Sequence, residues 1–149
     1  MSKDRRGICM LTTLIYRNFK GSYTEQMLEV YRSVGWNKHS KERIIQVFEA
    51  SNVRSIMLVD DKVVGFARAI SDGVFNAAIY DLVVHKSYQH KGLATKILRD
   101  ILIQLEPISC VHLLSTLGNE EFYLKNGFRK MKTGMARYNN PELAELYLL

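Results

Sequence analysis

Three strand-like runs stand next to one another in the middle of the chain, and only short turns separate them. They are Arg54–Val59, Lys62–Ile70 and Phe75–His85, with Asp60-Asp61 and Asp72-Gly73 in the turns between them. β-Branched and aromatic residues dominate the runs, and aspartate and glycine are typical turn residues. A connection of a few residues can join only antiparallel neighbours, because a parallel pair needs a long crossover. The sequence therefore predicts an antiparallel three-stranded meander at the centre of the fold.

The segments on either side of the meander are predicted to supply helices and further strands. Before it we expect a strand over Ile8–Tyr16, a helix that Ser22 and Glu25 begin as a capping box, and a second helix capped by Ser40. After it we expect a helix over Gly92–Leu105, a strand over Ser109–Ser115, a short helix over Asn119–Asn126, and one or two strands from Phe128 onward. This order predicts an α/β fold, with a mixed sheet and helices on its faces. Because the 149 residues contain no linker-like stretch, we expect a single domain over residues 1–149.

The charge balance indicates an anionic partner. Lys and Arg number 21 and Asp and Glu number 15, so the formal net charge is +6. Such an excess favours nucleic acid, an acidic membrane or a polyanionic small molecule. Cys9 and Cys110 are expected to be buried core residues of a protein in a reducing compartment, here the cytoplasm. No apolar run reaches the roughly 18–20 residues of a membrane span, and the four histidines lack metal-ligand spacing, so we expect no membrane partner and no metal.

The segment Gln89–Ala94 follows a predicted strand and opens a predicted helix. The first backbone N–H groups of a helix have no intrahelical partner, and the helix dipole adds positive charge there. Gly92 lets the backbone come close to a phosphate, and Ala94 keeps the first turn small. The segment lacks both the dinucleotide fingerprint and the Gly-Lys-Ser/Thr ending of a P-loop. It is therefore predicted to bind an anion in some other way.

A second motif lies about thirty residues downstream, Phe122-Tyr123 followed by Gly127-Phe128. With Gln89-x-x-Gly92-x-Ala94, and on this order of elements, the chain from Ile8 to about Arg137 resembles the GNAT N-acetyltransferase superfamily. The resemblance implies a GNAT fold with six to seven strands, splayed between the fourth and fifth, and about four helices. It also implies acetyl-CoA as cosubstrate, and some members of the family form homodimers.

The resemblance implies a role for each matching residue. The main chain of Leu82, Val83 and Val84 would bind the pantetheine arm, and Gln89, His90, Lys91, Gly92, Leu93 and Ala94 would hold the pyrophosphate. Tyr123 matches the family's acid, which reprotonates the departing thiolate. Asp81 is the candidate base, although a substrate anchor and a structural hydrogen bond remain open for it. The family often has Asn where this chain has Thr116, and Asn119 could replace it.

The acceptor side is expected between the first helices and the third and fourth strands, with Tyr31, Trp36, Arg68 and Tyr80 as candidate contacts. Arg68 could instead form a hairpin salt bridge with Asp72. The function expected is acetyl transfer to a primary amine by direct attack in a ternary complex, most simply to a small molecule. The alternatives are a protein or peptide acceptor and a catalytically silent acyl-CoA-binding module. A nucleic-acid partner is not expected, because the basic run from Lys125 to Arg137 is explained by a solvated face.

Overall fold

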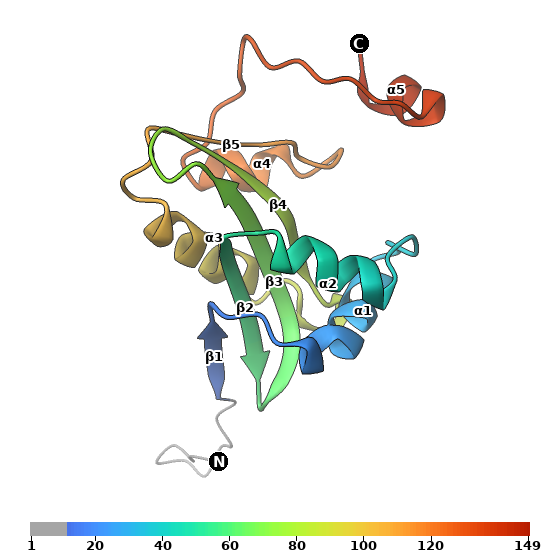
Figure 1. Ribbon diagram of the computed structural model, residues 1–149, viewed down its shortest axis with the longest axis vertical. Coiled ribbons are helices and arrows are strands. Elements are labelled where there is room, and N and C mark those ends of the chain that lie inside the picture. The colour runs from blue at the N-terminus through green and yellow to red at the C-terminus, as the bar shows by residue number, and fades with distance from the viewer. Residues whose placement is uncertain (1–11) are drawn as a thin grey trace. The chain divides into compact units, whose positions relative to one another are not determined.

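The computed structural model describes residues 12–149 and contains two compact units, one that ends at Leu114 and one that spans Ser115–Leu149. The strands of the first unit are β1 (Thr13–Tyr16), β2 (Val53–Val59), β3 (Lys62–Ser71), β4 (Asn76–Val84) and β5 (Cys110–Leu113) (Figure 1). Its α-helices are α1 (Thr24–Ser33), α2 (Lys41–Glu49) and α3 (Leu93–Gln104), and short 3-10 helices η1 (Gly21–Tyr23) and η2 (Lys86–Tyr88) precede α1 and α3. The second unit contains α4 (Glu120–Lys125) and α5 (Pro141–Tyr147).

The five strands form one sheet in the order β1-β2-β3-β4-β5. The first three pairings are antiparallel, so the predicted meander is confirmed, and β5 joins β4 in parallel. Asp60 and Asp61 both have positive φ, 47° and 64°, which is the geometry of a two-residue type I′ hairpin turn. Aspartate tolerates this conformation better than most residues, and this explains why the β2–β3 turn forms without glycine.

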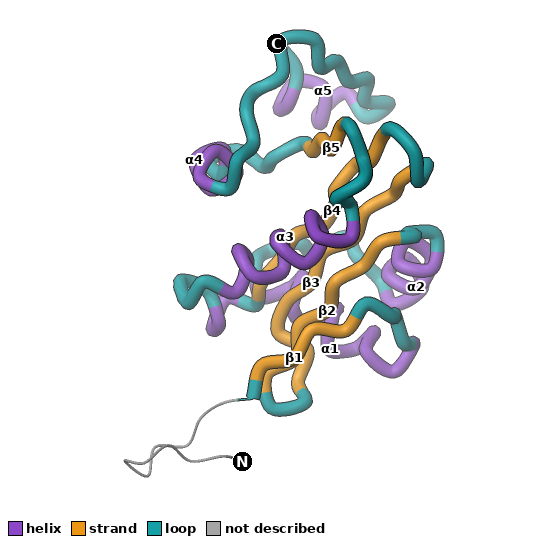
Figure 2. The backbone as a smooth tube through the Cα atoms, turned by 90° about the vertical axis from the view of Figure 1, so that its left-hand side faces the viewer, coloured by secondary structure: helices purple, strands orange, loops and turns teal. Residues whose placement is uncertain are grey.

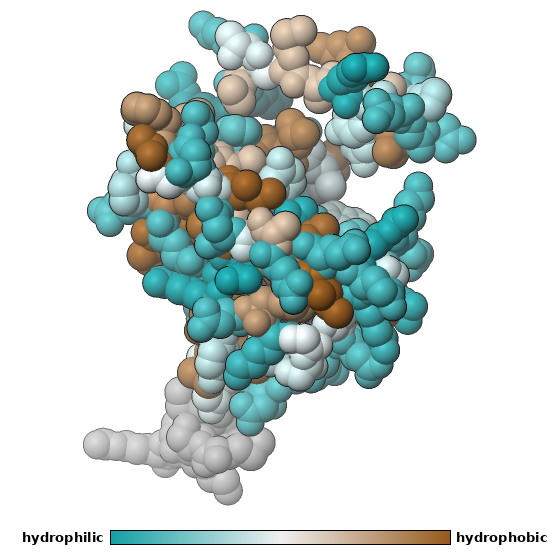
Figure 3. Space-filling model, in the orientation of Figure 1, coloured by the Kyte–Doolittle hydropathy of each residue, from teal (hydrophilic) through white to brown (hydrophobic). Residues whose placement is uncertain are grey.

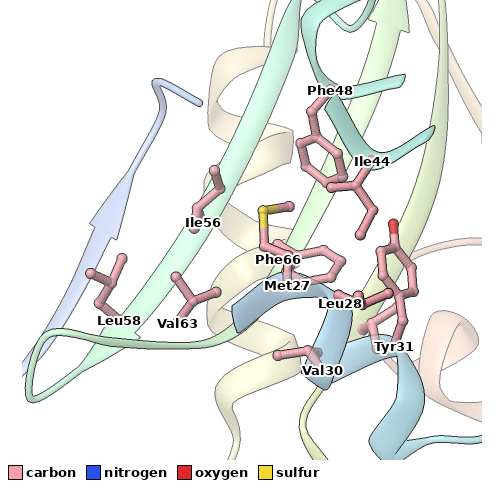
Figure 4. Packing of buried hydrophobic residues seen from close by; sticks show 11 residues of the cluster. Met27, Leu28, Val30, Tyr31, Ile44, Phe48, Ile56, Leu58, Val63 and Phe66 are labelled. Atoms are coloured by element: carbon pink, nitrogen blue, oxygen red, sulfur yellow. The ribbon is translucent and has the colours of Figure 1, made fainter. Parts of the chain in front are cut away.

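Helices cover both faces of the sheet, with α1 and α2 on one side and α3 on the other (Figure 2). The buried cluster on the α1 and α2 side contains Met27, Leu28, Val30 and Tyr31 of α1, Ile44 and Phe48 of α2, and Ile56, Leu58, Val63, Phe66 and Val83 of the sheet (Figure 4). Polar side chains dominate the outer surface over α1 and α2 (Figure 3). The apolar spacing seen in the sequence therefore does face the sheet.

The other face of the sheet is packed tightly against α3. Ile97, Leu98 and Ile101 of α3 are fully buried. Gly65 of β3 lies under them, and a Cβ built there would come within 2.9 Å of Ile97 Cδ1 and of the Val83 carbonyl oxygen. Only glycine allows this close approach, and α3 is thereby held against the centre of the sheet.

The starts of the helices confirm one predicted cap and correct another. The Ser40 hydroxyl accepts from the Arg43 N–H at 3.3 Å, as expected. Ser22, however, lies inside η1, and α1 begins at Thr24 with no side-chain cap bond. The Thr24 hydroxyl donates instead to the Gly21 carbonyl at 2.6 Å. The predicted capping box is wrong because a turn of 3-10 helix precedes α1, and the Glu25 carboxylate pairs with Lys41 instead.

The end of the chain is also corrected, because no strand forms from Phe128 onward. The described sheet therefore has five strands rather than six or seven, and the described chain has five α-helices. Charged and flexible residues dominate the stretch 129–137, where Thr133 is the only β-branched residue, and Met135 is 97% exposed. The Asn140 side chain caps α5 by accepting from the Glu142 N–H at 2.9 Å, and Pro141 stands at its first position.

Three further expectations can be compared with the described residues. Residues 8–11 of the expected first strand, and Cys9, lie outside them. Cys110, expected in the core, is exposed because it is the first residue of the edge strand β5. Over residues 12–149, no helix is both long and apolar enough to cross a membrane.

Candidate active site

The first component of the candidate site is a strand edge with free backbone groups. β4 pairs with β5 only over Asn76–Ile79, while its other edge stays paired with β3 as far as Val84. Leu82, Val83 and Val84 therefore lie where β4 has no strand neighbour on the β5 side among the described residues. The Gln89 side chain donates to the Val84 carbonyl at 3.0 Å and so occupies one group of this edge. The remaining backbone groups could bind an extended amide-containing ligand in the manner of an added strand.

A β-bulge precedes this free edge. Phe66 lies opposite Val83 and Arg68 opposite Tyr80, so Asp81 and Leu82 together face the single residue Ala67. Asp81 has a φ of +54°, the left-handed conformation that an extra residue in a bulge can adopt. As a consequence, alternation along β4 is broken at this point, and the side chains of Tyr80 and Asp81 both contact Arg68.

Arg68 contacts two of the other residues predicted for the site, Asp81 and Tyr80. Its Nε donates to Asp81 Oδ2 at 2.8 Å, and the two side chains are only 13% and 19% exposed. Its guanidinium carbon lies 4.8 Å from the centre of the Tyr80 ring, within the range of a cation–π contact. Its Nη1 donates to the buried Ser51 hydroxyl at 3.2 Å. The structure therefore places Arg68, Tyr80 and Asp81 in one cluster.

The alternative partner considered for Arg68 has a different role. Asp72 is exposed, and its Oδ1 accepts from the backbone N–H groups of Val74, Phe75 and Asn76 at 2.8, 2.8 and 3.0 Å. These bonds hold the pKa of Asp72 below its usual value. The predicted Arg68–Asp72 salt bridge is wrong, because Asp72 closes the β3–β4 loop while Arg68 reaches Asp81.

Tyr31 and Trp36 lie beside this cluster in the core under α1. Tyr31 is fully buried, and its hydroxyl has no hydrogen-bond partner within residues 12–149. Burial raises the pKa of Tyr31, and the negative charge of the nearby Asp81 carboxylate raises it further. The Tyr31 ring stacks on His39, with centroids 3.8 Å apart, and Trp36 stacks at 5.9 Å.

Two residues of this region were missed as site candidates in the sequence. His39 shares the loop between α1 and α2 with Trp36, but it was considered only as a possible metal ligand. Its Nδ1 is buried without a partner in the described part of the chain. Ser51 follows α2 and has no signal in the sequence beyond its position, since its role depends on Arg68 reaching it across the sheet.

The predicted anion-binding segment, Gln89–Ala94, follows the C-terminal end of β4. His90 and Gly92 have positive φ, 62° and 77°, on either side of Lys91, and all three residues are exposed. Gly92 is the N-terminal cap of α3 without a side-chain cap bond, and the first turn of α3 contains no acidic residue. The first intrahelical bond runs from the Lys96 N–H to the Gly92 carbonyl at 3.3 Å. The backbone N–H groups of Leu93, Ala94 and Thr95 therefore have no intrahelical acceptor, and groups of this kind can bind an anion.

Tyr123 and Asn119 belong to the second unit. The Tyr123 ring is half-buried and packs edge-on against Phe122 and Phe128, with centroids 5.1 and 5.9 Å away. Burial raises the pKa of Tyr123. Asn119 is exposed, and its side-chain amide donates to the Thr116 hydroxyl at 2.5 Å. The two candidates for the family's Asn position thus bond to each other, and each remains a prediction.

No group of three or more His, Cys, Asp or Glu side chains suited to a metal ion occurs within the part of the chain that the structure describes.

Comparison with known proteins gives concordant matches. A family model described as an acetyltransferase (GNAT) domain matches residues 52–130. The chain is 33% identical over 124 residues to the uncharacterized N-acetyltransferase ycf52 of Porphyra purpurea, covering 79% of this chain and 71% of that protein. It is 33% identical over 97 residues to serotonin N-acetyltransferase 2, chloroplastic, of Oryza sativa subsp. japonica, covering 61% of this chain but only 48% of that protein. Among solved structures, a GNAT-family acetyltransferase of Streptococcus pneumoniae TIGR4 is 30% identical with a TM-score of 0.72, covering 87% of this chain and 98% of that one.

Proposed function

The chain belongs to the GNAT acetyltransferase family, and from this premise we propose that it transfers the acetyl group of acetyl-CoA to the primary amine of a small molecule. The observation that carries the proposal is the layout of β4. A free backbone edge at Leu82–Val84 lies on the same strand that leads into an uncapped helix N-terminus at Gly92. An extended arm ending in phosphates requires these two features one after the other.

The coenzyme would be held mainly by backbone groups. The backbone groups of the Leu82–Val84 edge that Gln89 does not occupy would bind the amides of the pantetheine arm. The N–H groups of Leu93, Ala94 and Thr95, together with the α3 dipole, supply positive potential for the pyrophosphate. Lys91 is exposed, and its Nζ lies 5.5 Å from the centre of the Tyr88 ring. Its ammonium group would add a positive charge next to the pyrophosphate.

The chemical step requires an amine to attack the thioester and a thiolate to leave. We assign the acid to Tyr123, because it stands at the position of the family's acid in the Phe122-Tyr123 and Gly127-Phe128 motif, and a phenol is protonated at neutral pH. The phenol then donates its proton to the departing sulfur, and the attacking amine loses one proton to solvent or to a nearby base. The reaction proceeds in one ternary complex without an acetylated enzyme.

The acceptor would lie on the α1 and α2 side of the sheet. Tyr80 is 41% exposed there, and Trp36 is half-buried in the loop after α1, so aromatic surfaces border the region. One relative is named serotonin N-acetyltransferase 2, and this name supports an aromatic primary amine as the first acceptor to test. A cytoplasmic location and the absence of nucleic-acid and membrane partners stay predictions from the sequence, and the resemblance leaves the oligomeric state open between monomer and homodimer.

The test is acetyl-CoA turnover, followed by thiol release, against aromatic amines, amino acids, amino sugars and peptides with free N-termini or lysines. Turnover with a small amine is the expected result. Turnover with peptides alone would establish the protein-acceptor alternative, and coenzyme binding without turnover would establish the silent module. Failure to bind acetyl-CoA in calorimetry would overturn the proposal.

A further inference from the structure

We propose that Asp81 acts as a positioning residue rather than as a base, and that its ion pair with Arg68 holds the β4 bulge open for the coenzyme. The inference rests on the proposed function, and it deepens it by naming what sets the geometry of the binding edge. Its starting point is that the candidate base is also a residue with left-handed backbone inside a strand, at φ +54°.

The bulge needs a specific stabilising contact. Left-handed backbone is unfavourable for residues with a Cβ, and aspartate is among the few that tolerate it. Arg68 stands on β3 directly opposite Tyr80, next to the bulge, and its Nε reaches Asp81 Oδ2 at 2.8 Å. The bond therefore ties the extra residue of β4 to the strand beside it.

Arg68 is itself fixed from two other directions. Its Nη1 donates to the Ser51 hydroxyl at 3.2 Å, and Ser51, 1% exposed, donates in turn to the Val47 carbonyl of α2 at 2.6 Å. The Tyr80 ring covers the guanidinium at 4.8 Å. A side chain held on three sides gives Asp81 one fixed partner rather than a mobile counter-ion.

The pairing also leaves Asp81 poorly placed to act as a base. Its Oδ2 accepts from Arg68 Nε, and both side chains are largely buried. Removing one partner of a buried ion pair is costly, because the other charge is left without its counter-charge. The geometry thus favours a carboxylate that orients Arg68 and the bulge rather than one that faces the substrate amine.

The consequence for binding lies in the backbone. An extra residue shifts the side-chain and hydrogen-bond alternation by one, so the groups of Leu82–Val84 that face the free edge are opposite to those of a regular strand. Losing the bulge would present the wrong N–H and C=O groups to the pantetheine amides. Both the affinity for acetyl-CoA and the turnover would then fall, although Asp81 itself is assigned no contact with a reacting atom.

The test compares Asp81→Gly with Asp81→Ala. Both variants remove the carboxylate, and they differ mainly in whether the residue accepts positive φ. We expect kcat/KM and acetyl-CoA affinity of Asp81→Gly to exceed those of Asp81→Ala by about tenfold. Asp81→Asn accepts positive φ and can still accept from Arg68, but it loses the ion pair, so it is expected to lie between Asp81→Gly and the wild type.

A general base predicts a different pattern. All three variants would then lose about 10²- to 10⁴-fold in turnover alike, and the acid limb of the pH–rate profile would disappear in Asp81→Asn. An equal loss of turnover in all three variants would overturn the proposal, and so would loss of the acid limb in Asp81→Asn. Equal acetyl-CoA affinity of the Gly and Ala variants would also overturn it. Backbone ¹³C chemical shifts of residue 81 report φ without activity, so loss of the left-handed signature in Ala but not in Gly tests the bulge even if no acceptor is found. Absence of acetyl-CoA binding and turnover in the wild type would instead refute the proposed function itself.

Discussion

The Phe128 N–H donates to the Tyr123 carbonyl at 3.0 Å, and the rings of the two residues lie 5.9 Å apart. Gly127 stands between them in sequence with φ +89°, and its N–H donates to the Leu124 carbonyl at 3.3 Å. Together these bonds form the Schellman ending of α4, with its usual apolar contact across the helix end. Gly127 and Phe128 of the downstream motif therefore end α4 in a way that orients the Tyr123 ring.

Replacing Gly127 should disturb Tyr123 from a distance. Gly127→Ala forces a Cβ into left-handed backbone and is expected to cost about 1 kcal/mol, with a fall in kcat of about tenfold as the Tyr123 ring loses its fixed position. Thermal unfolding and thiol-release kinetics measure the two effects. Gly127→Asn is the control, since asparagine accepts this conformation, and it should keep most of both quantities. Equal losses in the two variants would show that the helix ending does not position Tyr123.

Removing the Tyr123 hydroxyl should lower turnover without weakening coenzyme binding. Tyr123→Phe keeps the ring contacts with Phe122 and Phe128, so we expect about a 10²-fold lower kcat and an unchanged Kd for acetyl-CoA. An acid must be protonated to act, and burial raises the pKa of Tyr123. The wild-type kcat should therefore stay constant until the pH exceeds the pKa of a free phenol. The alkaline fall in kcat should vanish in Tyr123→Phe.

A matched control for this change is Tyr138→Phe in the same unit. Tyr138 is half-buried and stacks on Tyr147 of α5 at 5.7 Å, outside the motif. Its loss of a hydroxyl should leave kcat near the wild-type value. Wild-type turnover in Tyr123→Phe would mean that another group or water protonates the thiolate.

The meander and the start of α3 after Gly92 could be predicted because their signals are local. Two short turns dictate antiparallel pairing, and Gly92 before an amphipathic stretch marks the start of α3. The end of the chain was predicted wrongly, because strands were expected from Phe128 onward although Arg129 and Lys130 open a stretch with little strand propensity.

The bulge and the partner of Asp81 could not be predicted for a different reason. In a regular strand, successive side chains alternate between the two faces of the sheet. The left-handed backbone of Asp81 breaks this alternation in β4, and no glycine in the sequence marks the position. Regular alternation would place Asp81 on the face of Ile79 rather than beside Tyr80. The partner of Arg68 depends on this register, which long-range packing sets, and so the nearer Asp72 was the natural but mistaken choice.

The anion-binding segment gives a prediction with an internal control. Gly92 and Gly73 both have φ +77°, and an added Cβ meets nothing within 4 Å at either position. Gly92→Glu and Gly73→Glu therefore carry the same backbone strain and the same charge change. We expect Gly92→Glu to weaken acetyl-CoA binding at least 100-fold, because a carboxylate would stand at the helix start in place of a phosphate. Gly73→Glu should bind normally in calorimetry.

The control also decides the interpretation. Equal weakening in the two variants would trace the effect to net charge or to stability rather than to the Gly92 helix start. Normal binding by both would refute the placement of the pyrophosphate. A steep salt dependence of wild-type affinity, flattened in Lys91→Gln, would add that Lys91 contributes a direct charge.

The β3–β4 loop should make stability depend on pH. The Asp72 carboxylate accepts three backbone N–H bonds, and these lower its pKa in the folded state. A depressed pKa means that its contribution is complete above the unfolded-state value near pH 4 and is lost as pH falls through the folded-state value. Asp72→Ala should therefore unfold at a lower temperature than the wild type at pH 7, with the gap narrowing below about pH 4. Glu49→Gln removes an exposed carboxylate at the end of α2, and it should show no such gap. A gap for Asp72→Ala that stays constant from pH 7 to pH 2.5 would show that the ionised carboxylate is not what closes the loop.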